Sequence, residues 1–395
     1  MKQKRVLVTG AGIVSAIGVG TDETLQSLKN LKSGIGSLSV LKSKLTDIPV
    51  AEVGLRNSEL AELTGIYADD ISRNTLLAMV AARFAVRASG YPKLLPAETG
   101  LILATTSGGM DLNEQYYKSL LESNRYKHLI PAFDSADATE QLAVHFGIQH
   151  HVTTISTACS SSANAIMLGA RLIKSGRVKR VLAGGTDALT KFTLNGFNAL
   201  EILSLTGCMP FDANRNGLTI GEGAAMLMLE SEDTAEPGNI LCEVTGFANV
   251  NEAFHATASS SDGFGASLAM EKALQQALLN PSDISYINAH GTGTAINDLS
   301  EGNAMRKIFG DHLPPVSSTK SFTGHTLGAA GAVEAVFSAL AIQKQVLIPQ
   351  TGFSIPMPEV NIVPVKELQP YTINHVISNS FGFGGNNTAL IFSKA

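Results

Sequence analysis

The same short pattern occurs twice in this sequence: a β-branched strand, a turn of small residues and an alanine-rich helix. The first copy is residues 152–174, VTTISTACSSSANAIMLGARLIK, and the second is residues 316–340, VSSTKSFTGHTLGAAGAVEAVFSAL. Apolar strand runs that lack alternation and are followed by helices predict parallel or mixed sheets covered by helices on both faces. The repeat therefore predicts an α/β protein made of two similar halves that face one another.

The polar segment 231–238, SEDTAEPG, contains Pro and Gly and follows an apolar run, which is typical of a boundary between structural units. We place the boundary there, giving an N-terminal half of residues 1–237 and a C-terminal half of residues 238–395. The other predicted strands, some with a glycine-rich turn at one end, lie within residues 4–18, 101–109, 180–187, 217–229, 240–250, 285–294 and 375–392.

Composition excludes several classes of protein. The chain has 395 residues, of which only 16% are charged, and its net charge of −5 leaves no broad basic surface for nucleic acid. We find no apolar run as long as a membrane span and no secretory signal, so we expect no membrane insertion and a cytoplasmic location. Three cysteines without metal-like spacing fit a reducing compartment.

The N-terminal stretch KRVLVTGAGIVSAIG superficially resembles a dinucleotide-binding turn. That fingerprint needs a third glycine at the position of Ser15, after Gly10 and Gly12. We therefore predict no nucleotide cofactor.

Cys159 is the one reactive side chain of the first strand–turn–helix unit. Small neighbours leave room for a substrate, and the N-terminus of the following helix favours a thiolate over a thiol. The backbone N–H of the cysteine, freed at the turn, can also stabilise an oxyanion. A buried packing role is the alternative for a lone cysteine.

Two histidines occupy matching turns, His290 in NAHGTGT and His325 in KSFTGHTLGAAG. Open α/β sheets bind ligands at such strand ends, and Lys320 and Glu301 are further ionisable groups nearby. A cysteine with one histidine fits hydrolysis or simple acyl transfer. With two imidazoles, an acyl thioester can form on the cysteine while an enolate is stabilised beside it, which fits carbon–carbon bond formation by decarboxylation.

The motifs TACSSS, NAHGTGT, KSFTGHTLGAAGA and NSFGFGGNN, in this order, resemble those of elongating β-ketoacyl-acyl carrier protein synthases. The N-terminal VTGAGIVSAIG and the central FDANRNGLTIGEGA extend the resemblance over nearly the whole chain. It implies the thiolase-like fold, a duplicated α/β unit in five αβαβα layers. It also implies a 3-oxoacyl-acyl carrier protein synthase that serves fatty acid or specialised polyene or polyketide synthesis.

The resemblance implies a role for each matching residue. Cys159 is the nucleophile, His290 and His325 bind the malonyl thioester and promote loss of CO2, and Lys320 with Glu301 forms a supporting charge pair. The remaining implied residues are the oxyanion hole and gate (Cys159 and Phe383, with Gly382 and Gly384 flanking the latter), the phosphopantetheine and pocket contacts (Thr292, Thr294, Asn387, Phe197 and Leu218) and a structural monovalent-cation site (Asn288, Glu334 and Ser378).

The same resemblance implies acyl carrier protein as a partner, Na⁺ or K⁺ as a structural ion, and no other cofactor. It implies a dimer, either of identical chains or with a related chain-length-factor-like subunit. Arg125 and Lys127 are our candidates for the carrier-docking surface. Two departures affect the pocket: GTGTAIND stands where many relatives read GTSTPxGD, keeping Asp298, and Leu218 replaces an aromatic residue.

Three alternatives are weaker. A thiolase needs a second cysteine near the C-terminus, and FGFGGNN has none. A starter-type synthase would carry Asn in place of His325, and a non-catalytic chain-length partner would have lost Cys159.

Overall fold

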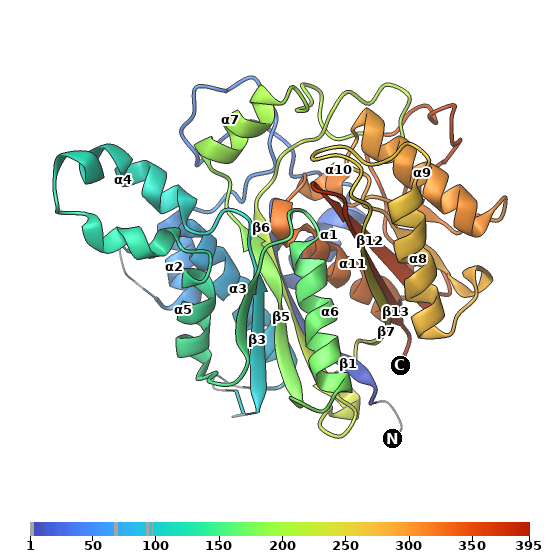
Figure 1. The fold of residues 1–395 in the computed structure, drawn as a ribbon, viewed down its shortest axis with the longest axis horizontal. Coiled ribbons are helices and arrows are strands. Elements are labelled where there is room, and N and C mark those ends of the chain that lie inside the picture. The colour runs from blue at the N-terminus through green and yellow to red at the C-terminus, as the bar shows by residue number, and fades with distance from the viewer. Residues whose placement is uncertain (1–3, 67–69, 92–94, 97) are drawn as a thin grey trace.

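The computed structural model describes residues 4–66, 70–91, 95–96 and 98–395. Eleven of its strands form a mixed sheet in the order β4-β3-β5-β6-β1-β7-β13-β12-β8-β9, with the short β2 pairing to β1, and β10 and β11 form a separate two-stranded sheet. Figure 1 shows how the central strands and the helices around them are arranged. The N-terminal half contributes β1 (Val6–Ser15), β2 (Gly18–Val19), α1 (Gly20–Lys29), α2 (Asn57–Thr64), α3 (Arg73–Ala88), β3 (Thr99–Ala104), α4 (Met110–Glu122), the 3-10 helix η1 (Lys127–Phe133), α5 (Asp137–Phe146), β4 (Val152–Ile155), α6 (Ser161–Lys174), β5 (Arg180–Asp187), α7 (Lys191–Ala199) and β6 (Gly223–Ser231).

The C-terminal half follows through the 3-10 helix η2 (Pro237–Asn239), close to the predicted boundary. Its elements are β7 (Cys242–Asn251), α8 (Phe264–Ala277), η3 (Pro281–Asp283), β8 (Tyr286–Asn288), α9 (Ala295–Phe309), β9 (Val316–Ser317), α10 (Lys320–Thr323), η4 (Leu327–Ala329), α11 (Ala330–Lys344), β10 (Val346–Leu347), β11 (Gln369–Pro370), β12 (His375–Gly382) and β13 (Asn386–Ser393).

The two halves have the same topology. In the first half β3 pairs in parallel with β4 and β5, while β6 pairs antiparallel with β5 and β1. In the second half β8 pairs in parallel with β9 and β12, while β13 pairs antiparallel with β12 and β7. The halves join where β1 pairs with β7. The predicted mixed sheets and duplicated plan are therefore both present.

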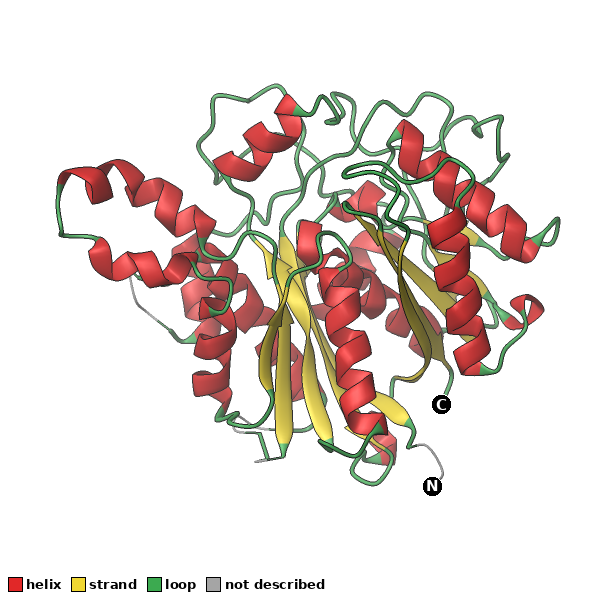
Figure 2. Ribbon diagram, in the orientation of Figure 1, coloured by secondary structure: helices red, strands yellow, loops and turns green. Residues whose placement is uncertain are grey.

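Three apolar clusters define the layers. The central cluster contains α6 and α11 packed between the strands of both halves, including Ile166, Val336 and Val376. A second cluster packs α3 and α5 on the outer face of the first half, and a third packs α8 and α9 on the outer face of the second. Figure 2 shows helices on both faces of each set of strands. Helix, sheet, helix, sheet and helix thus follow one another, as the five-layered thiolase-like fold requires.

The helical stretch Leu327–Lys344 differs from one expectation. It has 18 residues and is apolar enough to span a membrane by composition, although the sequence reading found no such run. In the structure 89% of it is buried within the protein, where it forms the middle layer. Burial on all sides explains its apolar composition, because a helix enclosed by two sheets has no polar face.

In both copies of the repeated pattern, candidate catalytic residues lie in the segment between the strand and the long helix. Cys159 follows β4, His290 follows β8, and Lys320 with His325 follows β9. The long helix of the second copy begins only at Ala330, so His325 lies in the turn before it rather than at its first residue. The carboxyl ends of these parallel strands converge, which brings residues 159, 290 and 325 into one site.

Candidate active site

Cys159 lies in a sharp turn between β4 and α6. The preceding Ala158 has a left-handed backbone with φ of 53°, and α6 begins two residues later at Ser161. Such a turn lifts one side chain out of the strand-to-helix connection and costs backbone strain for a residue with a Cβ. Cys159 is 6% exposed, and its sulfur faces the cavity described below.

Burial dominates the ionisation of this thiol. It raises the pKa of Cys159 to about 11, although the Lys320 ammonium and the backbone N–H of Phe383 both act to lower it. The net direction is opposite to the lowered thiol pKa expected at a helix N-terminus, because burial outweighs the groups that favour the thiolate. The thiolate loses more solvation free energy on burial than the nearby dipoles and the Lys320 charge supply as electrostatic stabilisation.

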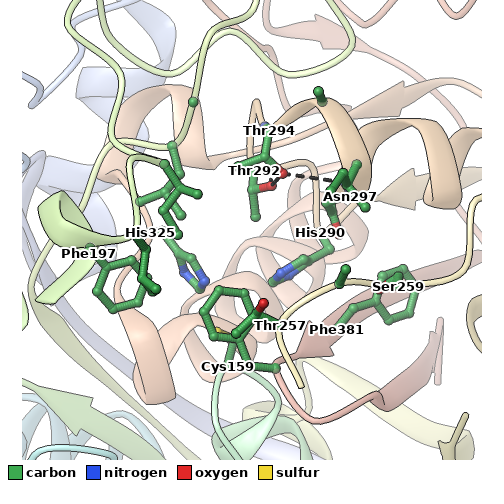
Figure 3. Close-up of a pocket in the computed structure, with 18 of the residues that line it drawn as sticks. Cys159, Phe197, Thr257, Ser259, His290, Thr292, Thr294, Asn297, His325 and Phe381 are labelled. Carbon is green, nitrogen blue, oxygen red and sulfur yellow. Dashed lines mark hydrogen bonds between the residues drawn. The ribbon is translucent and has the colours of Figure 1, made fainter. Parts of the chain in front are cut away.

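His290 and His325 meet above the cysteine. Their ring centroids are 5.3 Å apart with an interplanar angle of 87°, and each side chain is 2% exposed. Both imidazoles point into the pocket that contains Cys159 (Figure 3). Burial, and then the Lys320 charge, holds the pKa of each histidine well below its usual value of 6.5. Both rings are therefore neutral at pH 7.

Lys320 fixes the tautomer of His290. Its Nζ lies 3.1 Å from His290 Nδ1 and 2.6 Å from the His290 carbonyl oxygen, and it also donates to Glu334. An ammonium can only donate, so Nδ1 accepts and Nε2 carries the proton. His290 therefore offers an N–H donor on the side of the ring away from Lys320.

The predicted Lys320–Glu301 pair is wrong. Lys320 instead forms a buried ion pair with Glu334, and both side chains are 2% exposed. Ser380 donates to the other Glu334 oxygen at 3.1 Å. Helix α11, not α9, faces the lysine, so it supplies the carboxylate.

Glu301 has a different position. Its two oxygens accept from the backbone N–H groups of His290 and Gly291, each at 2.8 Å, and Asn379 donates to it at 3.1 Å. Burial raises the pKa of Glu301 to about 7. The carboxyl group thus shapes the turn that carries His290 without pairing with a cation.

A cavity of about 470 Å³ opens onto these residues. Most predicted contacts line it, whereas Lys320, Glu301, Gly384 and Asn387 do not. Asn387 is buried and donates to the Gly385 carbonyl at 3.0 Å, so it supports the loop rather than closing the pocket. The lining residues named by the sequence are Cys159, His290, His325, Thr292, Thr294, Phe197, Leu218, Phe383 and Gly382.

Phe383 stacks on Phe197 across the cavity, with ring centroids 6.1 Å apart and an interplanar angle of 18°. Gly382 lets the Phe383 loop approach the nucleophile, since an added Cβ there would lie 3.0 Å from the Thr157 oxygen and 3.2 Å from the Cys159 nitrogen. Gly384 has φ of 82° and open space around it. The first glycine is needed for contact and the second for backbone conformation.

The sequence reading missed one wall of the cavity. His255, Thr257, Ala258 and Ser259 line it, as does Phe381, whose ring centroid is 5.7 Å from that of His290. The run of small polar residues HATASSSDG was the available signal, since small side chains between a strand and a helix leave room for a ligand.

Residues that differ from the family pattern line the cavity. Ala295, Ile296 and Asn297, from the segment GTGTAIND, line it together with Leu218. Thr292 and Thr294 share a hydroxyl contact of 2.9 Å at the same mouth. The differences therefore alter the surface that a substrate meets, whereas Cys159 and both histidines are unchanged.

The other two cysteines lie outside the cavity lining. Cys208 is buried and donates to the Thr292 carbonyl at 3.3 Å, and Cys242 is buried in β7. Neither supplies the second cysteine that a thiolase would need. Within the described ranges, no group of three or more His, Cys, Asp or Glu side chains could hold a metal ion.

Comparisons with known proteins agree with this site. Residues 3–235 match the family model for the β-ketoacyl synthase N-terminal domain, and residues 241–354 match that for the C-terminal domain. The chain is 34% identical over 412 residues to 3-oxoacyl-(acyl-carrier-protein) synthase 2 of Staphylococcus aureus (strain COL), covering 100% of this chain and 99% of that relative.

Two solved structures are similar over the whole length of both chains. The ishigamide ketosynthase/chain length factor superposes with a TM-score of 0.91 at 28% identity. A type II polyketide synthase ketosynthase, bound to the hexaketide and in complex with its acyl-carrier protein, gives a TM-score of 0.87 at 28% identity. With both family models and this full-length relative matched, the chain belongs to the β-ketoacyl synthase family of thiolase-like condensing enzymes.

Proposed function

We propose that this protein is a decarboxylating 3-oxoacyl-acyl carrier protein synthase with Cys159 as its nucleophile. The observation that carries the proposal is the placement of one cysteine and two neutral imidazoles around a single cavity. A hydrolase would need only one imidazole and a water, whereas this arrangement provides for a thioester and an enolate together.

The first step is acyl transfer. The Cys159 sulfur attacks the thioester carbonyl of an acyl carrier protein, a new carbon–sulfur bond forms, and the bond to the phosphopantetheine sulfur breaks. The thiol proton of Cys159 ends on that leaving sulfur. The backbone N–H groups of Cys159 and Phe383 stabilise the oxyanion, and the contact of Phe383 N–H with the Cys159 sulfur supports this role.

The second step is condensation. Malonyl thioester loses CO2, and the electron pair of the broken carbon–carbon bond forms an enolate whose oxygen accepts from the two histidines. The enolate carbon attacks the acyl group on Cys159, and the carbon–sulfur bond breaks. Because the pKa of Cys159 is about 11, the departing thiolate takes up one proton to regenerate the resting thiol. Neutral imidazoles suit this step because they donate without first losing a charge.

Acyl carrier protein is the proposed substrate carrier. Thr292 and Thr294 lie at the cavity mouth, where their hydroxyls reach the phosphopantetheine arm. Arg125 and Lys127 are exposed and remain our candidates for contact with an acidic carrier. The cavity departures at residues 295–297 and 218 support a specialised acyl chain, in polyene or polyketide synthesis, over housekeeping fatty acid synthesis.

A second subunit is part of the proposal. Among the described strands, β4 ends the sheet and no strand pairs with its outer edge. In the same half of the chain, α4 and η1 expose large apolar side chains, including Leu121, Ile130 and Phe133. Unpaired edges and apolar patches are features of association surfaces. The partner is a second copy or a chain-length-factor-like chain, and co-expression with a homologous neighbour distinguishes the two.

A structural Na⁺ or K⁺ also fits. Asn288 and Ser378 are directly paired on β8 and β12, and Asn288 Oδ1 and Ser378 Oγ are buried without a hydrogen-bond partner in the described chain. Glu334 would add its main-chain oxygen, which already accepts from Asn288, because its carboxylate is held by Lys320. Hard cations take such oxygen ligands. The ion would brace the strands behind the site.

For location we propose the cytoplasm, where three free cysteines remain reduced.

The half-reactions test the proposal. Cys159→Ala should abolish acyl loading and condensation while CO2 release from malonyl-acyl carrier protein survives. His325→Ala should load normally and lose condensation. Cys208→Ala is the matched cysteine control, and it should retain both acyl loading and condensation. Normal condensation by His325→Ala would show that the two-histidine mechanism is wrong.

A further inference from the structure

A half-buried side-chain amide, that of Asn386, lies between the turn that carries Cys159 and the loop that carries Phe383. Asn386 begins β13, three residues after Phe383. Its Oδ1 accepts from Ser160 Oγ at 2.6 Å, Asn249 Nδ2 at 2.6 Å and Asn164 Nδ2 at 3.1 Å. One carbonyl oxygen thus joins the nucleophile turn, the first residues of α6 and strand β7.

The contacts hold both sides of the nucleophile. Ser160 follows Cys159 directly and is fully buried, and its single hydroxyl proton is shared between Asn386 Oδ1 and the Thr157 carbonyl oxygen 2.8 Å away. Asn164 donates from the same Nδ2 to Thr157 Oγ1 at 2.9 Å. Ser160 is therefore bonded to Asn386 directly, and Thr157, two residues before Cys159, is bonded to it through Ser160 or Asn164.

The oxyanion hole depends on that connection. Its two N–H groups come from Cys159 and Phe383, which belong to different halves of the chain, so no single element fixes their separation. Backbone pairing of Asn386 with Asn251 anchors the start of β13 in the sheet. The Asn386 side chain links the start of β13 to the nucleophile turn, where a Cβ added to Gly382 would lie only 3.2 Å from the Cys159 nitrogen.

We propose that Asn386 is a positioning residue that sets the geometry of the oxyanion hole through its hydrogen bond to Ser160. The inference rests on the proposed function of Cys159 and deepens it. Asn386 does not line the cavity, so it touches no substrate and acts only through Ser160 and the turn. A displacement of about 1 Å at a reacting group costs on the order of 100-fold in rate.

The hydrogen bonds of the Asn386 amide suggest two variants that differ in whether the acceptor oxygen is kept. Asn386 uses Oδ1 as an acceptor three times, while its Nδ2 has only a 3.4 Å contact with Asn249 Oδ1. Asn386→Asp therefore keeps the acceptor oxygen. Asn386→Leu keeps the branching and number of heavy atoms and removes the acceptor. Thr388→Val is the matched control, because Thr388 bonds to Asn164 and Asn249 but not to Asn386.

The test measures acyl loading of Cys159 by rapid-quench intact mass, and CO2 release from malonyl-acyl carrier protein in a Cys159→Ala background. We expect Asn386→Leu to load about 10- to 100-fold more slowly than wild type. CO2 release should be unchanged, Asn386→Asp should recover most of the loading, and Thr388→Val should load normally. Should Asn386→Leu fail to fold, Ser160→Ala breaks the same bond from the other side and carries the same expectation.

Three results would overturn the inference: wild-type loading by Asn386→Leu, equal losses in the Leu and Asp variants, or a parallel fall in loading and CO2 release. The last would indicate general damage to the site. Failure of the proposed function looks different, since wild-type protein itself would then not load from any acyl donor.

Discussion

The ammonium of Lys320 lies 3.1 Å from Nδ1 of His290, in a site where both side chains are almost completely buried. This contact decides which nitrogen of His290 can face a substrate. Burial lowers the pKa values of both rings most, and the positive charge of Lys320 beside them lowers these values further, so the imidazoles stay neutral. The Glu334 carboxylate compensates the positive charge of Lys320, so the ammonium stays charged although it is buried.

Replacing Lys320 with Met should therefore impair both folding and chemistry. The uncompensated Glu334 carboxylate should cost about 3–5 kcal/mol of unfolding free energy, measured by urea titration. CO2 release from malonyl thioester should fall because His290 loses its fixed tautomer. The double variant Lys320→Met with Glu334→Leu should regain stability without regaining CO2 release. Recovery of both would mean that the lysine acts only on stability.

A double-mutant cycle separates the two candidate partners of Lys320. Because Lys320 forms its ion pair with Glu334 and not with Glu301, we expect a large coupling free energy, about 1–3 kcal/mol, between residues 320 and 334. Coupling between 320 and 301 should be much smaller, although Glu301→Gln should itself slow condensation by turning an amide N–H toward the backbone N–H groups of the His290 turn. Larger coupling to Glu301 would contradict the described ion pair.

The reactivity of Cys159 should depend on pH up to the alkaline range. Below its pKa of about 11, each added pH unit raises the thiolate fraction about tenfold, so alkylation by iodoacetamide should keep rising past pH 9. Peptide mass spectrometry after timed alkylation gives the rate at each cysteine. Cys208, whose pKa is raised to about 12, provides an internal reference. A plateau near pH 7 would show that the helix N-terminus outweighs burial.

Two glycines of the Phe383 loop should respond differently to alanine. Gly382→Ala places a Cβ against the Thr157 oxygen and the Cys159 nitrogen, so acyl loading should fall at least tenfold. Gly384→Ala has open space and only a left-handed backbone to sustain, a cost of about 1 kcal/mol. The acyl-loading rate should therefore fall in Gly382→Ala, whereas Gly384→Ala should lose mainly stability to urea. Both quantities are measured on both variants. Equal loading by the two would argue against close contact at Gly382.

Local patterns predicted the reactive residues better than their partners. Cys159, His290 and His325 stand in turns of small residues after short strands, so topology alone brings them together. Whether Glu301 or Glu334 contacts Lys320 depends on how α9 and α11 pack. The local sequence of each helix does not show that packing. The same holds for Asn386 and Asn387: neighbours in a strand point to opposite faces, and only the register of β13 shows which one reaches Ser160 in the nucleophile turn. The direction of the Cys159 pKa likewise depends on how completely the cavity is covered.

The most direct test of the central claim is intact-protein mass after incubation with a panel of acyl-acyl carrier protein thioesters. The account predicts a gain of one acyl group in wild-type protein and in Cys208→Ala, and no gain in Cys159→Ala. The chain that loads fastest would also define the acyl class that the cavity accepts. Equal acylation of the Cys159→Ala variant, or no acylation by any donor even with a co-expressed partner subunit, would contradict the assignment of Cys159 as the nucleophile.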